Sequence, residues 1–518
     1  MLLSDIVSTS RAVGESSSRL KKIDLLASLL KRTPTDEIET AIAFLSGAAR
    51  QGRIGVGGAQ IAEARSATPA EQPTLTVREV DETFDRIART AGAGSIAARL
   101  GRLRDLLSRA TSDEQDFLVR LLFGELRQGA LEGVLMEAVA RAAAIPAAHV
   151  RRAAMLAGAL APVAAKALSG GAAALGEFII RPFQAVQPML AESAEDVEAA
   201  LADLGEASLE YKLDGARIQV HKADDEVRVY TRNLREVTGA VPEVVAAVRT
   251  LGPKELILDG EAIALRADGT PQPFQITMRR FGRKLDVDAL RAELPISPFF
   301  FDALYIDGTP LIDEPLTRRS AVLAETARPG TLVPRITTAD REEASRFLER
   351  AIASGHEGVM AKALAGSYAA GRRGQAWLKI KRARTLDLVV LAVEWGSGRR
   401  RGTLSNLHLG ARDGARGGFV MLGKTFKGLT DEMLAWQTKR LLELEIARDA
   451  YVVYVRPELV VEIAFNEIQE SPQYPGRLAL RFARVKRYRP DKSAAEADTF
   501  ATLRAIYRQT TGLEPPPY

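Results

Sequence analysis

Residues 210–217 read Glu210-Tyr211-Lys212-Leu213-Asp214-Gly215-Ala216-Arg217, and the interpretation of the whole chain starts from this short segment. On an extended strand alternate side chains share one face, so the segment predicts Glu210, Lys212 and Asp214 side by side. Gly215 then allows a turn and a close approach of the backbone to a ligand. Taken alone, a lysine between two acids is explained equally well as an ordinary surface ion pair.

Four further segments bring similar groups into the same part of the chain. They read Leu258-Asp259-Gly260-Glu261, Phe300-Phe301-Asp302, His356-Glu357-Gly358-Val359-Met360-Ala361-Lys362 and Trp377-Leu378-Lys379-Ile380-Lys381. On strands, the alternation puts Asp259 with Glu261 on one face, and Lys379 with Lys381 on another. Carboxylates, lysines and an aromatic ring gathered in one region favour a binding site over a chance surface pair.

Around this region, the 518 residues predict about three domains. The first domain, 1–183, is predicted to be all-α because apolar residues recur there at helical spacing. A Gly- and Ala-rich stretch at 168–176, followed by Pro182 and Pro188, marks its end. An α+β domain over 184–384 and an all-β small barrel over 385–518 complete the predicted chain.

Local patterns predict the elements inside each domain. In the first, Ser112 and Gln115 are spaced as a capping box that begins a helix. In the second, helices are predicted over 240–251 and 339–353, and alternating runs predict strands at 208–213, 217–221, 227–231, 255–258 and 299–304. In the third, a helix is predicted over 431–444, with strands at 386–393, 404–409, 419–422, 459–468 and 478–487.

Composition excludes several classes of protein. The chain has no cysteine, which rules out disulfide scaffolds, thiol catalysis and Cys-ligated zinc or iron–sulfur sites. Its 71 Lys and Arg against 66 Asp and Glu give a net charge of +5, which is compatible with nucleic acid as a partner. No apolar run is long enough to span a membrane, and no basic region precedes an apolar core near Met1. We therefore expect a cytoplasmic protein, by default a monomer.

Together, the quoted segments resemble the signature motifs of the covalent nucleotidyltransferase superfamily, which contains DNA ligases, RNA ligases and capping guanylyltransferases. Arg481-Phe482-Ala483-Arg484 with Arg489-Pro490-Asp491-Lys492 resembles the last ligase motif, in a C-terminal OB-fold. Gly124-Glu125-Leu126-Arg127-Gln128-Gly129 resembles a DNA-contacting segment of archaeal and eukaryotic replicative-type ligases. The resemblance covers nearly the whole chain and implies an ATP-dependent DNA ligase with helical DNA-binding, adenylation and OB-fold domains.

The resemblance implies three steps that seal a nick in duplex DNA. AMP passes from ATP to Lys212, then to the 5′-phosphate, and is finally displaced by the 3′-OH. Lys212 must attack as a neutral amine, so we expect its pKa to be lowered by nearby cations, namely Mg²⁺, Lys379, Lys381 and Arg217. The neighbouring Glu210 and Asp214 would oppose this effect.

Further roles are implied for residues at matching positions. Glu210 would read the exocyclic amine of adenine, and Phe301 would stack on the base. Glu261 and Glu357 would hold Mg²⁺, with Glu261 also near the ribose. The remaining ATP contacts would come from Arg217, Arg232, Arg373, Lys379 and Lys381. In the last motif, Arg484, Asp491 and Lys492 would orient the departing pyrophosphate.

Duplex DNA would be bound mainly through its phosphates. Candidate contacts in the two outer domains are Arg127, Arg151, Arg152, Arg399, Arg400, Arg401, Lys424 and Lys427. The segment 382–387 is a predicted hinge that lets the last motif face ATP and then withdraw.

Alternatives to these readings remain open at this stage. Phe301 could be an ordinary core residue, Arg232 and Arg373 could be exposed loop residues, and Arg399–Arg401 could be a solvated face. An NAD-dependent ligase would need a cysteine-built zinc module, which this chain lacks. An RNA ligase or capping enzyme should lack the long helical domain, and a non-catalytic DNA-binding protein need not keep every matched residue.

Overall fold

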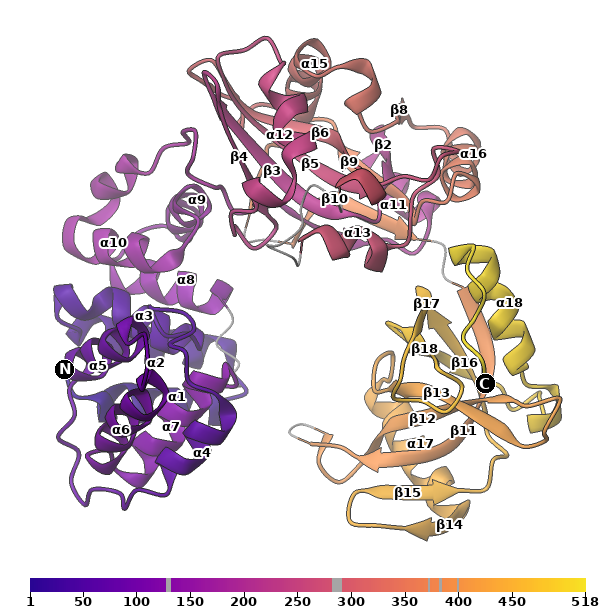
Figure 1. Cartoon of the computed structure of the whole chain (residues 1–518), viewed down its shortest axis with the longest axis horizontal. Helices are drawn as coiled ribbons and strands as arrows, with labels where there is room; N and C mark the ends of the chain where they lie inside the picture. The colour runs from indigo at the N-terminus through magenta and orange to yellow at the C-terminus, as the bar shows by residue number, and fades with distance from the viewer. Residues whose placement is uncertain (127–131, 282–290, 371–372, 382–383, 398–399) are drawn as a thin grey trace.

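The computed structural model describes residues 1–126, 132–281, 291–370, 373–381, 384–397 and 400–518, with the backbone alone described for 373–375. Figure 1 shows a helical N-terminal region, a mixed α/β central region and a β-rich C-terminal region. This arrangement confirms the predicted fold class, and the exact boundaries at 183/184 and 384/385 stay predictions. Among the described residues, no helix is both long and apolar enough to cross a bilayer.

The N-terminal region is built from helices around one continuous apolar core. Its helices are α1 (Leu3–Glu15), α2 (Arg19–Arg32), α3 (Ile38–Ser46), α4 (Gly58–Arg65), α5 (Val77–Arg89), α6 (Ser95–Ser108), α7 (Ser112–Phe123), α8 (Glu132–Ala142), α9 (Ala147–Ala157) and α10 (Leu160–Ala174). The predicted capping box of α7 is wrong by one residue. Thr111 and Glu114 form it, because Thr111 is the residue with extended backbone that precedes the helix.

The central region holds two five-stranded sheets, with orders β1-β10-β9-β2-β8 and β4-β3-β5-β6-β7. The strands are β1 (Leu190–Ser193), β2 (Ala207–Lys212), β3 (Ala216–Ala223), β4 (Glu226–Thr231), β5 (Glu255–Ala264), β6 (Ile296–Ile306), β7 (Thr309–Pro310), β8 (Arg335–Thr338), β9 (Gly358–Ala363) and β10 (Arg373–Lys381). The helices are α11 (Val197–Leu204), α12 (Pro242–Arg249), α13 (Phe274–Phe281), α15 (Leu316–Thr326) and α16 (Arg341–Ala353). Segment 210–217 crosses from β2 to β3, so it joins the two sheets.

The C-terminal region is a sheet of order β13-β12-β11-β15-β14, extended by β16 and β19, with a β17–β18 hairpin beside it. Its strands are β11 (Arg384–Trp395), β12 (Leu404–Arg412), β13 (Phe419–Thr425), β14 (Glu445–Arg448), β15 (Val452–Val455), β16 (Val460–Phe465), β17 (Glu467–Glu470), β18 (Leu478–Arg481) and β19 (Arg484–Tyr488). Helix α17 (Asp431–Glu443) matches its prediction, and α18 (Phe500–Thr511) is an additional helix that the sequence pattern did not indicate.

Two of the predicted C-terminal strands are in fact broken. The strand predicted at 459–468 divides into β16 and β17, and the strand predicted at 478–487 divides into β18 and β19. Phe482 adopts φ +56°, a left-handed conformation that an extended strand cannot accommodate. The break frees the β17–β18 hairpin from the main sheet.

The predicted hinge at 382–387 is only partly available for bending. Residues 384–387 already pair with β16, in the register Arg384↔Phe465 to Asp387↔Glu462. Asp387 is also held by Arg489 at 2.9 Å and by Lys492 at 2.5 Å. Residues 382–383 lie outside the described part of the chain, and the hinge stays a prediction.

A fully buried ion pair supports the wall of the central region. Arg319 on α15 and Asp302 on β6 are both 0% exposed, and their closest N···O distance is 2.7 Å. Arg319 also donates to the backbone oxygens of Glu314 and Gly366, at 2.6 and 2.9 Å. The guanidinium is therefore satisfied only while Asp302 is present.

We predict that Asp302→Ala lowers the free energy of unfolding by about 3–5 kcal/mol, because it leaves a buried guanidinium without its countercharge. Urea denaturation checks this value. Glu342→Ala, which breaks the exposed pair between Glu342 and Arg346, is the control and should cost less than about 0.5 kcal/mol. An equal decrease in the free energy of unfolding in the two variants would contradict the claim that the buried pair matters more than the exposed one.

Candidate active site

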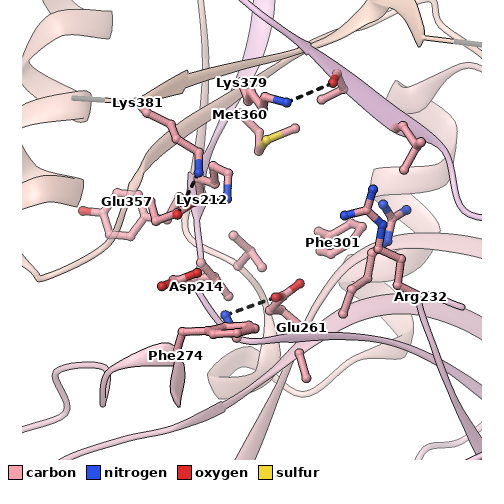
Figure 2. Close-up of a pocket in the computed structure, with 18 of the residues that line it drawn as sticks. Lys212, Asp214, Arg232, Glu261, Phe274, Phe301, Glu357, Met360, Lys379 and Lys381 are labelled. Carbon is pink, nitrogen blue, oxygen red and sulfur yellow. Dashed lines mark hydrogen bonds and ion pairs between the residues drawn. The ribbon is translucent and has the colours of Figure 1, made fainter. Parts of the chain in front are cut away.

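A pocket of about 720 Å³ opens between the two central sheets and the β17–β18 hairpin. Its lining includes most of the predicted residues: Glu210, Lys212, Asp214, Arg217, Arg232, Glu261, Phe301, Glu357, Lys379 and Lys381. Figure 2 shows Lys212, Glu357 and Lys381 close together at one side, with Phe301 and Arg232 across the pocket. The volume is in the usual range for a small-molecule site.

Strand pairing explains why Lys212 and Glu357 meet. Gly358 begins β9 and pairs with Lys212 on one side and with Lys381 on the other. Gly358 has φ +147°, and a Cβ at this position would lie 2.1 Å from the Ile380 carbonyl oxygen. Only glycine fits there, so the residue before it, Glu357, enters the pocket between the two lysines.

Glu357 is the shared partner of both lysines. Its carboxylate forms an ion pair with Lys212 and accepts from Lys381 at 2.8 Å. Burial alone lowers the pKa of Lys212, but the charge of Glu357, aided by Glu261 and Asp214, more than offsets this effect and raises that pKa. In the protein without a metal ion, the carboxylate of Glu357 therefore outweighs the neighbouring lysines and Arg217 at this amine. The expected lowering of the Lys212 pKa included Mg²⁺ among its causes, and it stays a prediction.

Gly215 also differs from its expected role. A Cβ at Gly215 would lie 2.4 Å from the Ala262 carbonyl oxygen on β5. The close approach that requires glycine is therefore to a neighbouring strand. The Gly215 backbone N–H donates to Glu261 at 3.1 Å, which fixes this carboxylate at the floor of the pocket.

Three carboxylates converge below Lys212. Asp214, Glu357 and Glu467 each offer one oxygen, and these oxygens all lie within 4.8 Å of one another. Glu467 comes from β17 in the C-terminal region, and nothing in the sequence pattern pointed to it. Burial, followed by the charges of Glu357 and Glu467, raises the pKa of Asp214 to about 8. Hard oxygen donors with surplus negative charge fit a cation such as Mg²⁺.

Glu261, predicted to hold metal, is not a member of this group of three. Burial raises the pKa of Glu261 to about 7. Its position beside Arg217, its partner across the β3–β5 ladder, is compatible with the predicted place near a ribose. Its metal role stays a prediction.

The opposite end of the pocket contains a carboxylate with one oxygen available. Glu210 is 2% exposed, and its Oε2 lies 2.5 Å from the Lys362 ammonium. The other oxygen, Oε1, is buried without a hydrogen-bond partner. Lys362 was quoted in the sequence motif but given no role, and its ammonium lies 4.6 Å from the centre of the Phe301 ring. This end can accept one hydrogen bond beside an aromatic face.

Some predicted residues lie outside the described part of the chain or have other partners. The backbone of Arg373, in β10, pairs with that of Leu190 in β1. The side chain of Arg373 lies outside the described part of the structure, as do Arg127 and Arg399. Lys379 lines the pocket, and its ammonium is 3.5 Å from the Ala191 carbonyl oxygen. The three residues expected to orient pyrophosphate do not line the pocket. Arg484 is exposed on β19, Asp491 pairs with Arg489, and Lys492 pairs with Asp387.

Arg481, the first residue of the quoted last motif, differs from these three residues in its position. It lines the pocket, lies 3.0 Å from Glu467 and stacks over Phe274 with 4.7 Å between its guanidinium carbon and the ring centre. Phe274 belongs to α13 of the central region, so this contact joins two regions. Arg481 was quoted in the last motif but was given no role there.

The candidate DNA-binding residues are partly engaged within the protein. Arg152 pairs with Asp313, and Arg151 is 3.3 Å from Glu137. Lys424 pairs with Glu394. The Arg400 side chain donates to the Phe426 carbonyl oxygen, and the Lys427 ammonium lies 5.5 Å from the centre of the Phe482 ring.

Comparison with protein families gives three matches along the chain. Residues 58–140 match the DNA ligase N terminus, 188–381 the ATP dependent DNA ligase domain, and 400–492 the ATP dependent DNA ligase C terminal region. The order of the matches follows the three regions of the fold.

Curated relatives match over the full length. A probable DNA ligase of Anaeromyxobacter sp. (strain Fw109-5) is 60% identical over 99% of both chains. A probable DNA ligase of Sorangium cellulosum (strain So ce56) is 56% identical over 98% of this chain and 95% of the relative. A solved structure described as Pmar-Lig_PreS3 shares the fold, with a TM-score of 0.62, 18% identity and coverage of 93% of this chain and 99% of its own. The chain belongs to the family of ATP-dependent DNA ligases.

We predict that Mg²⁺ releases protons from the protein at pH 7. With a pKa of about 8, Asp214 is mostly protonated at that pH and must lose its proton to coordinate a cation. Titration with MgCl₂ in weak buffer with a pH indicator measures the release. Asp214→Asn should abolish most of it, and Asp268→Asn, at an exposed loop acid, should not; equal release from Asp214→Asn and the parent protein would contradict the assignment.

Proposed function

We propose that Lys212 is the nucleophile that carries AMP between ATP and the nicked end of a DNA duplex. The observation that carries this proposal is the placement of the Lys212 amine in the pocket beside Glu357 and Lys381. The Lys212 nitrogen attacks the α-phosphorus, the bond to pyrophosphate breaks, and the amine proton is lost. AMP then moves to the 5′-phosphate, and the 3′-OH displaces it as the phosphodiester forms.

The charge on Lys212 explains how the reaction is held back until substrate arrives. In the nucleotide-free protein the ion pair with Glu357 favours the ammonium form, which has no lone pair for attack. A divalent cation held by Asp214, Glu357 and Glu467 would draw the Glu357 charge away from Lys212 and neutralise phosphate oxygens. With that charge removed, burial and the nearby Lys381 both favour the neutral amine.

The other residues that line the pocket would contact the adenine, the ribose and the phosphates of ATP. The free Oε1 of Glu210 accepts from the exocyclic amine of adenine, and Phe301 stacks on the base. Arg217, Arg232 and Glu261 face the ribose and its phosphate. Lys379, Lys381 and Arg481 supply positive charge where it builds up on the phosphates during transfer.

Arg481 and Glu467 support a closed arrangement for the first step. Both come from the C-terminal region and line the nucleotide pocket. Duplex DNA must also reach Lys212, so this region has to move away before the second step. Phosphate contacts from the outer regions, with affinity that falls as salt rises, would hold the nicked duplex for repair, replication or recombination.

We predict that Lys212→Arg abolishes transfer of label from α-labelled ATP to the protein, because a guanidinium keeps the charge but cannot form the phosphoramidate. Gel separation of labelled protein and sealing of a nicked DNA duplex measure both activities. Lys254→Arg, the same change at an exposed lysine, is the control and should keep both. Label on the Lys212→Arg protein, or sealing by it, would contradict the proposal.

A further inference from the structure

Tyr368 is a buried residue with no role in the mechanism described so far. It lies between β9 and β10, is 2% exposed and does not line the nucleotide pocket. Its hydroxyl donates to Asp259 at 2.7 Å and accepts from the Met189 backbone N–H at 3.1 Å and from Arg217 at 3.3 Å. A tyrosine hydroxyl can donate one hydrogen bond and accept two, so all the hydrogen-bonding positions of this hydroxyl are occupied.

The two other groups bound to this hydroxyl, Asp259 and Met189, also hold the side chain of Arg217. Two of its nitrogens donate to Asp259, at 3.1 and 2.6 Å, in a bidentate pair. A third donates to the Met189 carbonyl oxygen at 2.6 Å. The guanidinium carbon is held 5.5 Å from the centre of the Phe301 ring, at the edge of the pocket. Burial and Asp259 keep the pKa of Tyr368 well above its ordinary value, so the hydroxyl stays a donor.

Met189 ties this cluster to the segment that enters the central region from the helical one. Just before it, the buried Gln219 side chain holds the Val186 backbone N–H at 2.7 Å and its carbonyl oxygen at 3.1 Å. The Gln187 N–H donates to the Met155 carbonyl oxygen of α9 at 2.9 Å. The orientation of Arg217 is therefore linked, through backbone contacts, to the end of the helical region.

We propose that Tyr368 is a positioning residue of the nucleotide pocket, which acts by locking Arg217 against Asp259 and Met189. The proposal rests on the proposed contact between Arg217 and ATP. Without the hydroxyl, Asp259 loses a donor, the Met189 N–H loses its acceptor, and Arg217 can leave the orientation in which it meets the nucleotide. Such a change weakens ATP binding in the ground state and the transition state alike.

The test is Tyr368→Phe, which keeps the ring packed at 5.9 Å from Trp377 and removes only the hydroxyl. We expect KM for ATP in self-adenylation to rise about tenfold, equivalent to about 1.4 kcal/mol. Sealing of nicks by enzyme already loaded with AMP should change less than about twofold. Tyr305→Phe is the matched control: it removes a hydroxyl that donates to Glu255 at 2.7 Å in the same apolar cluster, and KM should not change.

Arg217→Ala separates this inference from the proposed function. If Arg217→Ala leaves KM unchanged, the proposed contact of Arg217 with ATP is wrong, and the role of Tyr368 falls with it. If Arg217→Ala raises KM but Tyr368→Phe does not, only the inference about Tyr368 is overturned. In the Arg217→Ala background, Tyr368→Phe should add less than about twofold, and a full tenfold effect there would also overturn it.

The melting temperature of Tyr368→Phe, and a second variant, separate an effect on folding from an effect on ATP binding. A lower melting temperature with unchanged KM would show a purely structural hydroxyl and would contradict the proposal. If Tyr368→Phe fails to fold, Asp259→Asn removes the charge that Arg217 and the Tyr368 hydroxyl both contact and replaces one acceptor oxygen, and it should raise KM. An unchanged KM in Asp259→Asn would then overturn the inference.

Discussion

The ion pair between Lys212 and Glu357 is the interaction on which the rest of the site depends. It exists because β9 pairs with both β2 and β10 through Gly358, so one carboxylate lies between two lysines. The same carboxylate is close enough to Asp214 and Glu467 to share a cation with them. In the proposed mechanism Glu357 would pair either with the amine or with a metal ion, and the charge of Lys212 would follow from which of the two it pairs with.

This arrangement connects chemistry to the position of the C-terminal region. Glu467 and Arg481 belong to the β17–β18 hairpin, and both reach the nucleotide pocket. One of the three grouped carboxylates, Glu467, comes from this hairpin, so the proposed cation site would be complete only while the hairpin is in place. The proposed mechanism would then tie nucleotide capture to the closed arrangement and DNA sealing to an open pocket.

Much of the site could be predicted from the sequence because its motifs lie on strands. Alternation predicted which residues of one strand share a face, and the family resemblance assigned Lys212, Glu261 and Lys381 to one site; all three line the same pocket. The capping box of α7 was misplaced because Thr111/Glu114 and Ser112/Gln115 both have suitable spacing, and only the backbone conformation separates them. The break in the strand predicted at 478–487 was missed because neither glycine nor proline occupies the left-handed position at Phe482.

Other features could not be predicted because they depend on contacts between distant parts of the chain. Glu467 reaches Asp214 across two regions, and Tyr368 reaches Asp259 from another loop, so no local pattern records either contact. The charge state of Lys212 in the protein without metal depends on a contact of the same kind. The motifs contain both the acids and the cations near it, but only the strand register places Glu357 against its amine.

The pH dependence of Lys212 modification by an amine-specific reagent, followed by mass spectrometry without ATP or metal, tests this account most directly. In the parent protein the pH at which the modification rate is half-maximal should lie above the ordinary lysine pKa of about 10.4. In Glu357→Gln, burial still lowers the Lys212 pKa but the negative charge of Glu357 no longer raises it. The pH midpoint should therefore fall below that of the parent protein. An unchanged or higher midpoint in Glu357→Gln would contradict the claim that Glu357 holds Lys212 in its charged form.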